Sequence, residues 1–73
     1  MMIETKIFDA MTDAEQKAWE ALSGYKFWMF GYHAGRWINY NKLLDKPLAN
    51  PFRDAVNLAR NKIDTFEVAK HEK

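Results

Sequence analysis

The sequence predicts a single all-α domain over residues 1–73, a small bundle of about three helices with an extended N-terminal arm. Three observations support this fold class. Apolar residues recur at spacings of three and four, the period of an α-helix. Two pairs that end or begin helices, Ser23-Gly24 and Asn50-Pro51, divide the chain. A chain of 73 residues without cysteine has room for one small core, stabilised by large side chains or by assembly.

The first eleven residues lie before the first clear helix signal. Ile3, Thr5 and Ile7 alternate weakly with polar residues, as in an extended segment. We therefore expect residues 1–11 to form an arm, either a short strand or a frayed turn.

The first helix is expected over residues 12–22. Thr12 followed by Glu15 is a capping-box pattern, in which the hydroxyl and the carboxylate satisfy amides of the first turn. Trp19 lies on the flank of a stripe of small apolar residues, which consists of Ala14, Ala18, Ala21 and Leu22.

A turn at Ser23-Gly24 separates this helix from the next. Glycine tolerates the left-handed conformation that ends helices, and serine can cap the helix that follows. The second helix is then expected over residues 25–44. An uninterrupted helix from Asp13 to Leu44 remains the alternative, because an internal glycine destabilises a helix by only about 1 kcal/mol.

The third helix is expected over residues 51–69. Pro47 ends the second helix, and Asn50-Pro51 combines a preferred N-cap with proline at the first helical position. Residues 70–73 are expected to fray. One apolar stripe runs along this helix and contains Phe52, Ala55, Val56, Ala59, Ile63 and Phe66.

The second helix carries two apolar stripes. The predicted core stripe contains Phe27, Phe30, Gly31, Ala34 and Ile38, with Trp37 at its margin. The other stripe is rich in aromatic residues and contains Tyr25, Trp28, Tyr32, Gly35 and Leu43.

Helices on two sides could cover both stripes. The first helix offers mainly alanine, however, so a surplus of aromatic surface is expected to serve as a contact surface for another protein or a second copy.

The residues predicted to bind a protein partner combine tyrosine, tryptophan and arginine. These types concentrate binding energy at interfaces, because each has a large flat body with a polar end. The same side chains can also border a core and keep their polar ends in water. The predicted partner-binding residues are Tyr25, Trp28, Tyr32, Arg36 and Tyr40.

Gly31 and Gly35 form a small-xxx-small pair on the same helix. Such a pair lets a second backbone approach closely. We interpret it as a close crossing with the third helix inside the monomer.

Nucleic-acid binding is the alternative function. Cations interleaved with aromatic residues can contact phosphates and stack bases, and the second and third helices have the outline of a helix-turn-helix. A net charge of +1 argues against it, because there is no overall basic field. The residues assigned to this alternative are Lys26, Lys42, Arg53, Asn57 and Arg60.

No residue pattern predicts catalysis, a cofactor or a metal. The two histidines, His33 and His71, stand alone, and there is no cysteine, phosphate-binding glycine loop or GxSxG turn. The longest apolar stretch is interrupted by His33 and Arg36, so we expect no membrane span. The N-terminus lacks the pattern of a signal peptide, and we expect a soluble cytoplasmic protein.

In overall style, the aromatic segment Ser23 to Leu43 in a tiny cysteine-free domain resembles the small accessory proteins of bacteriophages and other mobile elements. These include anti-restriction and anti-CRISPR inhibitors. The resemblance implies stoichiometric binding of a host protein, and no site residue can be carried over from it.

Overall fold

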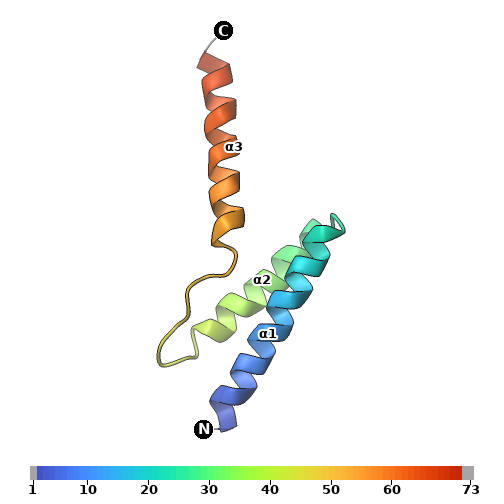
Figure 1. The fold of residues 1–73 in the computed structure, drawn as a ribbon, viewed down its shortest axis with the longest axis vertical. Coiled ribbons are helices and arrows are strands. Elements are labelled where there is room, and N and C mark those ends of the chain that lie inside the picture. Colours follow the sequence, from blue (N-terminus) through green and yellow to red (C-terminus); the bar gives the residue numbers. More distant parts are fainter. Residues whose placement is uncertain (1, 72–73) are drawn as a thin grey trace.

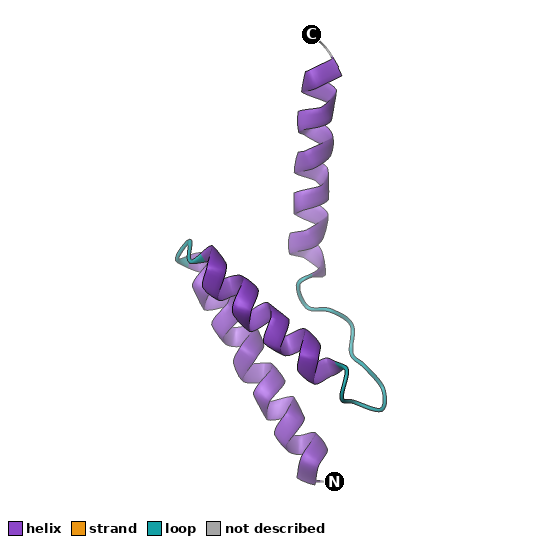
Figure 2. Cartoon of the chain, turned by 180° about the vertical axis from the view of Figure 1, so that it is seen from behind, coloured by secondary structure: helices purple, strands orange, loops and turns teal. Residues whose placement is uncertain are grey.

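The computed structural model describes the backbone of residues 2–71 and the side chains of residues 3–67. It contains three helices, α1 (Met2–Ser23), α2 (Phe27–Asn41) and α3 (Arg53–His71), and no strand within the described residues. The predicted all-α class and the three helices are confirmed. Only α1 and α2 pack along each other, as an antiparallel hairpin, while α3 points away from them (Figure 1). The view from behind shows the same separation (Figure 2).

The expected N-terminal arm is wrong, because α1 already begins at Met2. Ile7 and Met11 extend the alanine stripe toward the N-terminus at spacings of four and three, and both pack into the core. This continuous contact with α2 outweighs the weak local alternation. Thr12 consequently lies in the middle of α1 and does not cap a helix.

The predicted break between the first two helices is confirmed, but a different residue makes the turn. The Lys26 amide donates to the Ala21 carbonyl at 2.8 Å and the Tyr25 amide to the Leu22 carbonyl at 3.1 Å. These two bonds define a Schellman motif, in which the residue directly after the helix C-cap adopts the left-handed backbone conformation. That residue is Tyr25, with φ of 62°, whereas Gly24 has no positive φ.

The expected serine cap on α2 is also wrong. The Ser23 hydroxyl donates to the Glu20 carbonyl at 2.7 Å, within its own helix. Lys26 is the N-cap of α2 and makes no side-chain capping bond. The bonds of the turn therefore close α1 and leave the start of α2 without a side-chain cap.

The hairpin is held together by small side chains on α1 facing one large ring on α2. Ala14 and Ala18 are fully buried, as predicted, and Trp37 is 4% exposed. Trp37 was expected at the margin of the core stripe, but α1 crosses α2 over this residue. Phe27 and Ile38, expected in the core, are 61% and 38% exposed.

The connection between α2 and α3 folds back on the hairpin. The Asn41 side chain brackets Leu48, accepting from its amide at 2.8 Å and donating to its carbonyl at 3.1 Å. The Asn50 side chain accepts from the Phe52 amide at 2.8 Å within the turn that precedes α3, so Pro51 is not the first residue of this helix as predicted. The bounds differ from prediction: α2 ends at Asn41, and α3 begins at Arg53.

Phe52 attaches the base of α3 to the hairpin. Its ring lies 5.1 Å from Trp19, 5.5 Å from Phe30 and 6.2 Å from Trp37, between ring centroids. Only 4% of its surface is exposed. Such tilted and edge-to-face arrangements are favourable beyond the area they bury.

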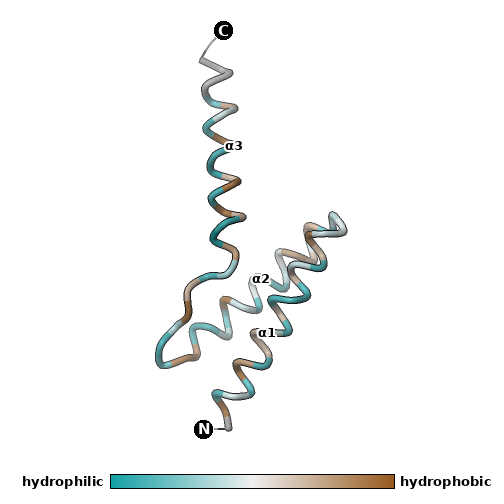
Figure 3. Tube along the Cα trace, viewed as in Figure 1, coloured by the Kyte–Doolittle hydropathy of each residue, from teal (hydrophilic) through white to brown (hydrophobic). Residues whose placement is uncertain are grey.

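The monomer exposes more surface than its size requires. Its accessible area is 6149 Å², whereas a compact protein of 8.6 kDa is expected to expose about 4,700 Å². Its radius of gyration is 15.8 Å, against about 11 Å for a compact chain of this length. Apolar residues lie along the projecting α3 as well as in the hairpin (Figure 3). The excess of about 1,400 Å² is surface that a partner could cover.

Candidate protein-binding surface

Three of the five residues predicted to bind a partner project from α2 and the turn before it. Tyr25, Trp28 and Tyr32 are 78%, 74% and 67% exposed, and we call them the α2 aromatic face. Trp28 and Tyr32 are four residues apart on α2, which places them on one side of the helix. Phe27, with its ring 6.2 Å from that of Tyr25, extends the exposed apolar surface. Phe27 was missed because it was placed in the core.

Tyr25 is held in the left-handed backbone conformation, which is unfavourable for a residue that has a Cβ atom. A left-handed residue with a Cβ loses about 1–2 kcal/mol relative to a right-handed one. Its ring, which remains largely in solvent, contributes little burial in return. Strained backbone of this kind clusters at functional sites in other proteins.

Replacing Tyr25 by glycine is expected to stabilise the monomer by about 1 kcal/mol, because glycine adopts the left-handed conformation freely but is more flexible when unfolded. The melting temperature should rise by about 4–8 °C. Thermal unfolding followed by circular dichroism measures this shift. A lower melting temperature would mean that the Tyr25 ring contributes more to the fold than its exposure suggests.

The two glycines of α2 border the aromatic face. The predicted close crossing of α3 at Gly31 and Gly35 is wrong, because a Cβ built at either position meets no atom within 4 Å. Nothing inside the monomer therefore requires glycine at these positions. Each glycine destabilises α2 by about 1 kcal/mol relative to alanine.

The other two predicted residues, Arg36 and Tyr40, are turned toward α1. The Arg36 guanidinium lies 3.0 Å from His33 Nδ1 and donates to Asp13 at 3.5 Å. It also lies 5.9 Å from the centre of the Tyr40 ring. Because arginine can only donate, His33 Nδ1 is the acceptor of this contact. Arg36 thus joins α2 to α1 through Asp13, and Tyr40 packs against the hydrophobic core. His33 lies between Arg36 and the aromatic face, because its ring is 5.1 Å from that of Tyr32.

Asp13 receives two cations at this junction. Lys17, at 3.3 Å on the same helix, and Arg36, at 3.5 Å on α2, hold the pKa of Asp13 below its ordinary value of 3.8. The Tyr40 hydroxyl, and then Asp13, raise the pKa of Arg36. The Asp13 carboxylate therefore stays ionised to a lower pH in the folded hairpin than in the unfolded chain.

We expect Asp13→Asn to lower stability slightly near neutral pH and not at all in strong acid. A depressed carboxyl pKa stabilises the fold above the unfolded value of 3.8, and this contribution disappears as the pH falls through the folded value. Urea unfolding of both proteins at about pH 7 and about pH 2 measures the difference. An unchanged difference at the two pH values would rule out the ion pairs as its source.

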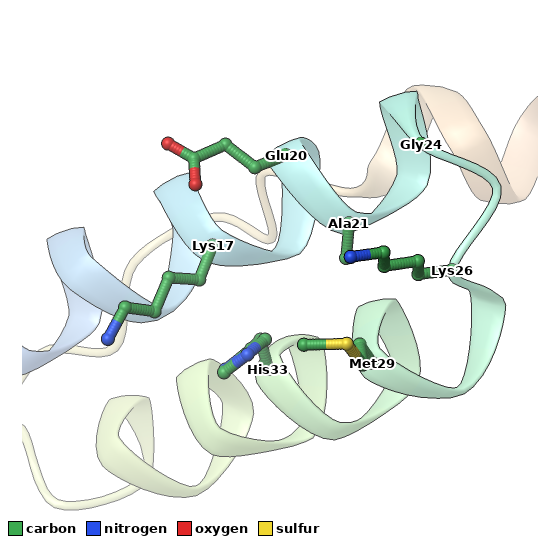
Figure 4. A pocket seen from close by; sticks show the side chains of 7 residues that line it. All are labelled: Lys17, Glu20, Ala21, Gly24, Lys26, Met29 and His33. Carbon is green, nitrogen blue, oxygen red and sulfur yellow. The ribbon is translucent and has the colours of Figure 1, made fainter.

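An open groove of about 450 Å³ lies between α1 and α2 near the turn. Met29 and His33 point into it from α2, and Lys26 extends across it toward Ala21 (Figure 4). The Glu20 carboxylate points away from the groove and accepts from Gln16 at 3.0 Å. The side chains that border it are either exposed or paired on their own helix, so the groove does not assemble a polar site.

The residues assigned to nucleic-acid binding are spread over two helices. Lys26 precedes α2 and Lys42 follows it, so they lie at opposite ends of that helix. Arg53, Asn57 and Arg60 share one side of α3, which also carries Asp64. Because α3 does not pack against α2, the two helices do not form a compact helix-turn-helix.

Among the described residues, no group of three or more histidine, cysteine or acidic side chains converges in a way that could hold a metal ion. Within the same part of the chain, none of the helices is long and apolar enough to cross a membrane.

Known proteins offer no guide to this surface. In comparisons with known proteins, no family model, curated protein or solved structure matches the chain.

Proposed function

We propose that this chain is a non-catalytic protein-binding module that uses the α2 aromatic face. The observation that carries the proposal is the exposure of Tyr25, Trp28 and Tyr32, at two thirds or more of each side chain. Residues of these types dominate the energetics of protein interfaces. A monomer that needed them only for folding would bury them, as it buries Trp37.

The neighbouring glycines support the same proposal. On a helix, Gly31 and Gly35 lie next to Trp28 and Tyr32 around the circumference. A partner helix could approach the α2 backbone closely over the glycines while the two rings cover its side. The open space beside both glycines is compatible with such an approach.

The available area is sufficient for a specific complex. A standard interface covers about 800 Å² of each partner, and the monomer exposes about 1,400 Å² more than a compact chain of its mass. The form of the function we propose is stoichiometric inhibition of a host protein, as the small size and cysteine-free composition resemble those of inhibitors carried by mobile elements.

Comparative affinity purification tests the proposal. Wild-type protein and the Trp28→Ala and Tyr32→Ala variants are immobilised, and proteins captured from a host lysate are identified by mass spectrometry. We expect each variant to keep its helical circular dichroism and to bind the captured partner about 30-fold or more weakly in titration, since hot-spot residues contribute 2 kcal/mol or more.

Ile3→Ala is the control, because Ile3 is 70% exposed on α1, away from the aromatic face. It should retain full binding. Equal binding by wild type and both aromatic variants would contradict the proposal. Binding of DNA or RNA that weakens steeply with salt and with Arg53→Glu would instead support the nucleic-acid alternative.

A further inference from the structure

We draw no further inference here: the strongest candidate, the apolar groove of about 320 Å³ between α2 and the base of α3 together with the exposed Val56, Ile63 and Phe66 along α3, is an apolar face without a partner, and nothing in the structure shows what covers it.

Discussion

Replacing Trp37 by alanine is expected to unfold the α1–α2 hairpin. Trp37 is the large side chain of α2 that lies buried against α1, at 4% exposed, and it faces the fully buried Ala14 and Ala18. Truncating a buried tryptophan destabilises a protein by about 3–5 kcal/mol, because it leaves a cavity that small neighbours cannot fill. Alanines on α1 have no longer side chain to move into that space.

The destabilisation expected for Trp37→Ala is large relative to the free energy of unfolding of the whole chain. Marginal stability of about 0.05–0.15 kcal/mol per residue gives a chain of 73 residues only about 4–11 kcal/mol. Urea unfolding followed by circular dichroism should therefore show Trp37→Ala partly or fully unfolded without denaturant.

Trp28→Ala is the matched control for this prediction. It makes the same substitution on the same helix, but at a side chain that is 74% exposed. Exposed substitutions usually change stability by about 0.5 kcal/mol or less. Similar losses for the two variants would show that the Trp28 ring is enclosed in solution, which would also remove the basis for the α2 aromatic face.

The helices and the buried alanine stripe of α1 could be predicted from the sequence, because both depend on the local spacing of apolar residues. Ala14, Ala18 and Ala21 could be assigned to the core without knowing their partner. The N-terminal turns of α1 were harder, since Ile7 fits an alternating pattern with Ile3 and also a helical pattern with Met11. The packing of Ile7 and Met11 into the core decides between the two patterns.

Which side of α2 faces α1 could not be predicted from any local pattern in the sequence. A helix with apolar residues on two sides can present either one to its neighbour. The helical projection placed Trp37 at the margin of the core stripe. In the structure α1 alone covers α2, and Trp37 lies at the centre of the contact while Phe27 is exposed.

The same reasoning explains which part of the site was predictable. Tyr25, Trp28 and Tyr32 stood out because their ring area exceeded what a helix of alanines could cover. Arg36 and Tyr40 lie only a part-turn away on α2, and their projection gave no sign that Asp13 of α1 would reach Arg36. The extent of the aromatic face therefore depends on contacts between residues that are far apart in the sequence.

Replacing Phe52 by alanine is expected to detach α3 from the hairpin and to destabilise the chain by about 3–5 kcal/mol. Phe52 is 4% exposed, and its ring meets those of Trp19, Phe30 and Trp37. No other residue at the base of α3 is buried to this extent among the described side chains. Losing the ring removes this attachment and also part of the lining of an apolar groove that Ala55 and Val56 form with Phe30 of α2.

Hydrogen exchange distinguishes this outcome from simple unfolding. In Phe52→Ala, the amides of α3 should exchange much faster than in wild type, while those at the α1–α2 contact remain the most protected. Phe52→Leu, which keeps apolar volume, should recover much of the protection. Phe27→Ala, at a ring 61% exposed on α2, should leave α3 unchanged. If Phe52→Ala preserves the protection of α3, then that helix is held by contacts other than this ring.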